Sequence, residues 1–177
     1  LTVASALILH GLLVYPTLLR ILAGVNPLTF LRKMREPMLV AFSTSSSGAT
    51  LPVTLRTVEH RIGVNNNVAS FAVPLGATIN MDGTAIMQGV ATVFIAQFFG
   101  YQLGVDALLM VILTATLASI GTAAVPGVGL ITLTLVLGQV GLPIEGIGLI
   151  IGVVIPVVSQ FLDSAVFSRN GIDSLLE

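Results

Sequence analysis

Long apolar runs occupy most of the chain, and short stretches of small or polar residues separate them. The first run, residues 3–22, is close to the roughly 20 residues that a helix needs to cross a bilayer. His10 interrupts this run, and nothing nearby in the sequence forms a ligand set with it. The pattern predicts a transmembrane helix within residues 1–25, in which His10 is a packed residue that faces other helices.

The second apolar region, residues 37–58, has basic residues close to both ends, with RKMR at 32–35 and RTVEHR at 56–61. Positive loops stay in the cytoplasm, so the segment should enter the membrane and return as a re-entrant hairpin. Its polar middle, STSSSGAT at 43–50, predicts the hairpin tip, because non-helical backbone at membrane depth must be buried in protein or line a wet cavity. The same small residues would also suit a close helix–helix interface, and both interpretations stay open.

The third region, residues 68–100, is too long for one simple span and contains the motif PLGATINMDGT at 74–84. We expect a broken helix there, with four residues as breakers: Gly76, Asn80, Asp82 and Gly83. A charged carboxylate near mid-bilayer costs at least ~2.5–3.5 kcal/mol, and no Lys or Arg is near Asp82 in the sequence. A hard cation is a natural partner, bound by Asn80, Asp82 and opened carbonyls. The alternative is a protonated or hydrogen-bonded Asp82 at an ordinary kink.

The fourth region, residues 105–143, has the small-residue stretch ASIGTAAVPGVG at its centre, and its flanking charges are acidic. This pattern indicates a second hairpin that enters from the opposite side. Its TAAVP resembles GATLP of the first tip, and a polar interruption follows each tip. A hairpin followed by a broken helix would thus occur twice, and the two hairpins would enter the membrane from opposite sides. Such an inverted repeat is the architecture of secondary transporters.

The composition supports a membrane protein. The 177 residues are 55% hydrophobic and 8% charged, with a mean hydropathy of +1.03, whereas soluble domains carry roughly 25% charge. We therefore expect an all-α integral membrane protein in contact with the lipid bilayer. The net charge of -1 gives no indication of a nucleic-acid partner, and the absence of cysteine excludes disulfides and thiolate metal sites. Because the chain begins with Leu, we expect it to be the back portion of a longer protein.

Several motifs together resemble the dicarboxylate/amino acid:cation symporter family, the glutamate transporter homologues. They are LLVYPTLLR at 12–20, SSSGATLPVTLR at 45–56, PLGATINMDGT at 74–84, ASIGTAAVPGVG at 118–129 and VGLPIEGI at 140–147. The resemblance implies most of a transport domain that moves like an elevator, in a homotrimer at the plasma (inner) membrane. It implies symport of small organic anions or amino acids, coupled to Na⁺ with H⁺ as the alternative ion, and no enzymatic cofactor.

The resemblance also implies roles for individual residues. The substrate would contact the first tip, the broken helix and the second tip through Ser45, Ser46, Ser47, Thr84, Val125, Pro126 and Gly127. One cation site would use Gly76, Asn80 and Asp82. A second cation site would use Thr78, Met81, Ser119, Ile120 and Thr122. Residues 121–129 would form the mobile gate, which donates cation ligands only when it is shut.

The last segment, residues 146–177, departs from the family. The family pattern has two substrate- or structure-related Asp residues, an Arg, an Asn and a final Asp, and an ungapped continuation keeps none of these chemistries. A shifted register makes Asp163 and Asn170 candidate substrate ligands. The alternative function is therefore a degenerate, non-transporting homologue or assembly partner that has lost the substrate site. An intramembrane hydrolase is disfavoured, because Ser45–Ser47 would need a base in reach.

Overall fold

The computed structural model describes residues 2–125 and 127–152, and this part of the chain is helical with no β-strand. The all-α prediction is therefore confirmed for the described residues. The chain starts with one apolar rod, in which α1 (Thr2–Leu9), a π-helical turn (His10–Val14) and α2 (Tyr15–Ile21) follow without interruption. Within the described ranges, this 20-residue rod is the one helix long and apolar enough to cross a membrane.

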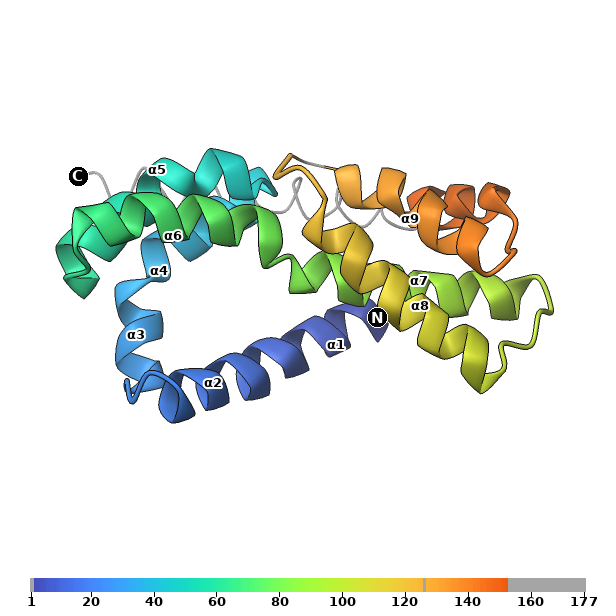
Figure 1. Cartoon of the computed structure of the whole chain (residues 1–177), viewed down its shortest axis with the longest axis horizontal. Helices are drawn as coiled ribbons and strands as arrows, with labels where there is room; N and C mark the ends of the chain where they lie inside the picture. Colours follow the sequence, from blue (N-terminus) through green and yellow to red (C-terminus); the bar gives the residue numbers. More distant parts are fainter. Residues whose placement is uncertain (1, 126, 153–177) are drawn as a thin grey trace, which may run out of the picture.

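The remaining helices form two groups at opposite ends of the molecule, and Figure 1 shows the rod α1–α2 running alongside them. One end of the molecule holds α4 (Arg35–Thr44), α5 (Ser47–Thr57) and α6 (Asn66–Ile79). The other end holds α7 (Asp82–Phe98), α8 (Val105–Ile120) and α9 (Val128–Gln139). Short α3 (Pro27–Lys33) leads from the rod to α4, and α1 packs against α7.

The helices α4 and α5 pack together as a hairpin whose turn is only two residues long. Ser45 adopts a left-handed conformation with φ 49° and ends α4. Ser46 is extended, and its Oγ accepts a hydrogen bond from the Ala49 N–H at 3.2 Å, which caps the start of α5. The polar stretch 43–50 is thus mostly helical, and the tip is narrower than its length in the sequence suggests.

The third region is broken as predicted, but only at Asn80 and Met81, between α6 and α7. The expectation that Gly76, Asp82 and Gly83 also break the helix is wrong, because Gly76 lies within α6, and Asp82 and Gly83 are the first two residues of α7. Glycine lowers helix stability by about 1 kcal/mol without forbidding the conformation, so neighbouring turns can carry it. The break lies where the two groups of helices meet, with α6 on one side and α7 on the other (Figure 1).

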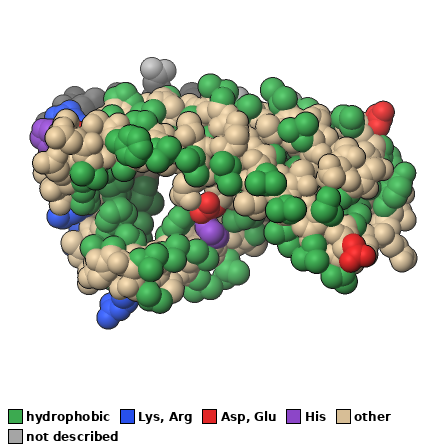
Figure 2. All heavy atoms as spheres, viewed as in Figure 1, with side chains coloured by type: hydrophobic (Ala, Val, Ile, Leu, Met, Phe, Trp, Pro, Cys, Tyr) green, Lys and Arg blue, Asp and Glu red, His purple; other side chains and the backbone are tan. Residues whose placement is uncertain are grey.

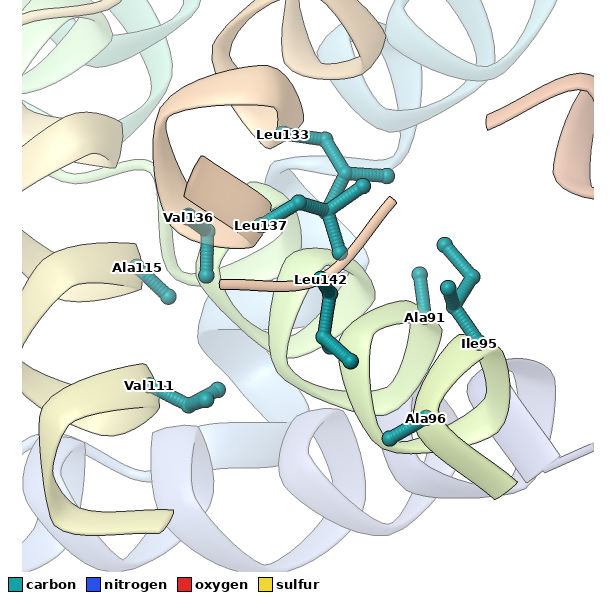
Figure 3. Close-up of a cluster of buried hydrophobic side chains, with 9 residues drawn as sticks. All are labelled: Ala91, Ile95, Ala96, Val111, Ala115, Leu133, Val136, Leu137 and Leu142. Carbon is teal, nitrogen blue, oxygen red and sulfur yellow. The ribbon is translucent and has the colours of Figure 1, made fainter. Parts of the chain in front are cut away.

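The hydrophobic core lies between α7, α8 and α9. Figure 3 shows its side chains converging from these three helices and from Leu142 of the following segment. The cluster consists of Ala91, Ile95, Ala96, Val111, Ala115, Leu133, Val136, Leu137 and Leu142. Gly146 packs so closely on this core that a Cβ there would lie 2.5 Å from Ile95 Cγ2. The second hairpin is therefore anchored on the second half of the broken helix.

Candidate functional site

A cavity of about 450 Å³ lies where the helix break meets both hairpin tips. Its walls come from four parts of the chain that are far apart in the sequence: the rod, the first tip, the helix break with the start of α7, and the second tip with the start of α9. The rod contributes Tyr15, the first tip contributes Ser45 and Ser47, and the remaining lining residues are Asn80, Met81, Asp82, Gly83, Thr84, Met87, Ala123, Ala124, Val125, Gly127, Val128, Gly129 and Leu130. Most substrate and several cation ligands expected from the sequence thus border one space.

Among the described residues, the two hairpin tips are joined by hydrogen bonds to one carbonyl oxygen, that of Ala124. Ala124 O accepts one hydrogen bond from the Gly48 N–H at 3.0 Å and another from Ser46 Oγ, also at 3.0 Å. A Cβ on Gly48 would lie 2.9 Å from the same oxygen, so the close approach requires glycine at this position. Ser46 therefore holds the tips together, while Ser45 and Ser47 on either side face the cavity.

The helix break brings oxygen donors to the cavity. The Asn80 N–H still bonds to Gly76 O at 2.9 Å, and the chain then leaves the helix for two residues before α7 begins at Asp82. The last carbonyls of a helix have no intrahelical partner, and those of α6 adjoin Asn80, which lines the cavity. Together with the Asn80 and Asp82 side chains, these oxygens are the ligands that a hard cation prefers.

The donor set fits an alkali cation better than a transition metal. Among residues 2–125 and 127–152, no group of three His, Cys, Asp or Glu side chains comes together that could hold a metal ion. One carboxylate with neutral oxygens suits a weakly bound monovalent cation that must be released again. Soft or strongly bound metals would call for several thiolate or imidazole ligands, whereas the chain has no cysteine and two histidines, of which His10 lies beside Asp82.

Asp82 has two partners that the sequence did not indicate. Its Oδ2 lies 3.2 Å from His10 Nε2 and accepts a hydrogen bond from the Tyr15 hydroxyl at 3.1 Å. Figure 2 shows an acidic and a histidine side chain side by side where the surface is hollowed. Asp82 is therefore hydrogen-bonded, as the alternative interpretation of this residue proposed. His10 lies next to the site. In the sequence, the one feature that could have indicated this contact is a single histidine within an apolar run.

Gln88 is a second residue that the sequence analysis missed. Its side chain is fully buried on α7, and Nε2 donates to Gly129 O at 3.2 Å and to Thr132 Oγ1 at 2.6 Å. Its Oε1 is buried without a partner in the described structure. Gln88 therefore ties the first turn of α9, at the base of the second tip, to the broken helix.

The remaining predicted ligands lie away from this cavity. Gly76 lines a separate cavity behind the first tip. Three hydroxyls of the expected second cation site donate within their own helices or helix ends: Thr78 to Leu75 O, Ser119 to Thr116 O and Thr122 to Ala118 O. Neither of the two cavities is lined by these three residues or by Ile120. The second cation site therefore stays a prediction.

Three candidate residues, Pro126, Asp163 and Asn170, lie outside the described residues, as does most of the atypical last segment. Of that segment, the structure describes Gly146, which ends a short 3₁₀ turn (Ile144–Gly146), and the helical residues 147–152.

A helical fold with a cavity beside an interrupted helix is a feature of one class of protein, the secondary transporters. Within that class, the chain belongs to the sodium:dicarboxylate symporter family, which matches residues 1–164. The resemblance drawn from the motifs is thereby confirmed. The family's name identifies Na⁺ as its coupling ion, and the family consists of transporters rather than enzymes.

Curated relatives agree with this assignment. The chain is 48% identical over 152 residues to excitatory amino acid transporter 3 of Mus musculus. The matched region covers 86% of this chain and 29% of the relative. It is 46% identical over 152 residues to an excitatory amino acid transporter of Caenorhabditis elegans, in a match that covers 86% of this chain and 30% of the relative. Excitatory amino acid transporter 5 of Homo sapiens is 45% identical, with 86% and 27% covered. The chain thus spans less than a third of each relative's length.

Proposed function

We propose that the protein is a sodium-coupled symporter of small organic anions or amino acids, and that this chain supplies most of its mobile transport domain. The observation that carries the proposal is the position of Asp82. This carboxylate stands at the helix break and borders the same cavity as both hairpin tips. A cation bound there would sit beside the substrate, so the binding of one would stabilise the binding of the other.

In this proposal the first cation site is built by Asn80, Asp82 and the carbonyls at the end of α6. Ser45, Ser47, Thr84, Val125 and Gly127 border the cavity and would contact the substrate. The contact between Ser46, Gly48 and Ala124 O would close the cavity when the second tip is shut. Thr78, Met81, Ser119, Ile120 and Thr122 would form a second cation site as the gate closes.

The membrane arrangement is also part of the proposal. The hairpins α4–α5 and α8–α9 would enter the bilayer from opposite sides and return, so that their tips meet near the midplane. The contact between the two tips supports this arrangement, because both approach the helix break. The complete protein would be a homotrimer that carries substrate by moving the transport domain across the membrane like an elevator.

The substrate class follows from the relatives, whose names describe excitatory amino acid transport. We propose acidic or neutral amino acids and dicarboxylates as the panel to test. Purified protein would be placed in liposomes with a sodium gradient directed inward, and uptake of each labelled compound would be measured. Uptake should require sodium, and potassium or choline at equal ionic strength should not replace it. Uptake that is independent of sodium would overturn the proposal.

A degenerate, non-transporting homologue is the second candidate, because the last segment lacks the family's charged pattern. In that case sodium would still bind at the helix break, while no compound of the panel would bind or be taken up. Saturable binding of any one compound, measured by calorimetry in the presence of sodium, would eliminate this candidate.

A further inference from the structure

We propose that His10 and Tyr15 are positioning residues for the cation site: they hold Asp82 in the orientation in which its other carboxylate oxygen binds the coupling ion. This inference rests on the proposed function, since it assigns a task at the same site. Neither residue belongs to the ligand sets considered above. Both come from the apolar rod, which is far from Asp82 in the sequence.

The geometry places both contacts on one oxygen. His10 Nε2 lies 3.2 Å from Asp82 Oδ2, and the Tyr15 hydroxyl donates to the same Oδ2 at 3.1 Å. The two rings also touch edge to face, with centroids 4.9 Å apart and planes at 80°. The two rings thus form one unit that contacts Oδ2, while Oδ1 accepts no hydrogen bond in the described structure and remains available to a cation.

The local helix geometry explains how two residues five positions apart can reach one atom. In a regular α-helix, residues five apart point to clearly different sides, because each residue turns the chain by about 100°. Here His10–Val14 form a π-helical turn. Hydrogen bonds in a π-helix join residues i and i+5, so this turn brings Tyr15 round towards the side of His10. Such single π turns are rare and frequently mark functional sites.

An oriented carboxylate matters for a weakly bound ion. Asp82 is the first residue of α7 and its side chain is about one third exposed, with a relative area of 34%, so packing alone does not fix its rotamer. Hydrogen bonds to a charged oxygen are stronger than those between neutral groups. Two donors on Oδ2 would fix the plane of the carboxylate before the ion arrives, which lowers the cost of ordering it on binding.

The chain offers a matched control for each residue, because it contains two tyrosines and two histidines. Tyr101 and His60 are both exposed and lie in other parts of the fold. The test set is Tyr15→Phe and His10→Ala, with His10→Gln to restore an N–H donor, and with Tyr101→Phe and His60→Ala as controls. Each variant would be studied as the purified membrane protein, with its melting temperature in the absence of sodium as the check of folding.

The measurement is a sodium titration of the melting temperature, followed by the substrate KM at saturating sodium. Loss of either donor should raise the sodium concentration for half-maximal stabilisation by roughly five- to tenfold, the scale of one ordinary intramolecular hydrogen bond. The KM at saturating sodium should stay within about twofold, because the substrate's own contacts are intact. His10→Gln should recover most of the loss, and both controls should behave as the unaltered protein.

Two results would contradict the inference in distinguishable ways. If sodium stabilises the unaltered protein, and Tyr15→Phe and His10→Ala respond to sodium as it does, the positioning role is wrong while the proposed function stands. If sodium does not stabilise even the unaltered protein, the proposed function fails and the positioning role fails with it. A rise in KM equal to the rise in the sodium requirement would indicate general damage to the site and would also count against positioning.

Discussion

The two helical hairpins have different constructions. The first, α4–α5, turns in two residues and buries few side chains in the described structure: Pro37, Thr50 and Thr57. The second, α8–α9, packs with α7 around the hydrophobic core, but the described residues between Ile120 and Val128, 121–125 and 127, are non-helical. The first hairpin therefore has a tight tip on loosely packed arms, and the second has a long tip on firmly packed arms.

This difference bears on the gate proposed for residues 121–129. Arms that share a close-packed core cannot shift without losing contacts, so motion of the second hairpin should be confined to its tip. Among its described residues, the tip meets the first hairpin through the single carbonyl of Ala124. The first tip has its own helix cap and left-handed residue, and should act as the fixed surface against which the second tip closes.

The largest difference in stability between the two hairpins should come from replacing one leucine in each by alanine. Leu133 of α9 is 0% exposed, whereas Leu39 of α4 is 68% exposed. Leu133→Ala should lower the free energy of unfolding by about 2–5 kcal/mol, because it leaves a cavity in the core. Leu39→Ala should change it by less than about 0.5 kcal/mol. Denaturation in detergent would measure both, and equal effects would remove the distinction between the arms.

A smaller effect is expected from separating the tips. Gly48→Ala places a Cβ within 2.9 Å of Ala124 O, and overpacking of this kind costs about 1–3 kcal/mol. Since the chain has no cysteine, Val125→Cys provides one thiol on the second tip. In that background, Gly48→Ala should make the thiol react several-fold faster with a water-soluble reagent.

Gly89→Ala is the matched control for this labelling experiment. A Cβ on Gly89 would meet no atom within 4 Å, so the variant should leave the labelling rate unchanged. An unchanged rate in Gly48→Ala would show that contact with the first tip does not protect the second.

The smallest effect should come from Ser46→Ala. This change removes both the cap of α5 and one of the two hydrogen bonds to Ala124 O. It should cost about 1 kcal/mol, the usual scale of a lost N-cap. Ser70→Ala removes an exposed hydroxyl that bonds only to carbonyls within α6, and should be nearly neutral. Thermal unfolding of both variants would test this, and equal melting temperatures would remove Ser46 from the tip contact.

The sequence predicted the features that depend on local chemistry. The break at Asn80 and the polar tip around Ser45–Ser47 both follow from polar residues in apolar surroundings. The sequence analysis predicted too long a first tip and predicted helix breaks at Gly76 and Gly83 that the structure does not have. The reason is that small and hydroxylated residues can remain helical when the residues around them form the helix hydrogen bonds.

Contacts between distant segments could not be predicted in the same way. Whether His10 and Tyr15 reach Asp82 depends on how α1 packs on α7 and on the π turn, and no single-residue preference encodes either. The same holds for Gln88, whose buried amide acquires a role only once α9 lies against α7. The membrane entry of the hairpins, the second cation site and the trimer stay predictions.

The central claim is that the helix break binds sodium through Asp82. Its most direct test is a sodium titration of the melting temperature for the unaltered protein, Asp82→Asn and the control Asp106→Asn, an exposed acid at the start of α8. A ligand that binds the folded state raises its stability with concentration. The account predicts a rise for the unaltered protein and Asp106→Asn, and none or a much weaker one for Asp82→Asn. An equal rise in all three proteins would contradict it.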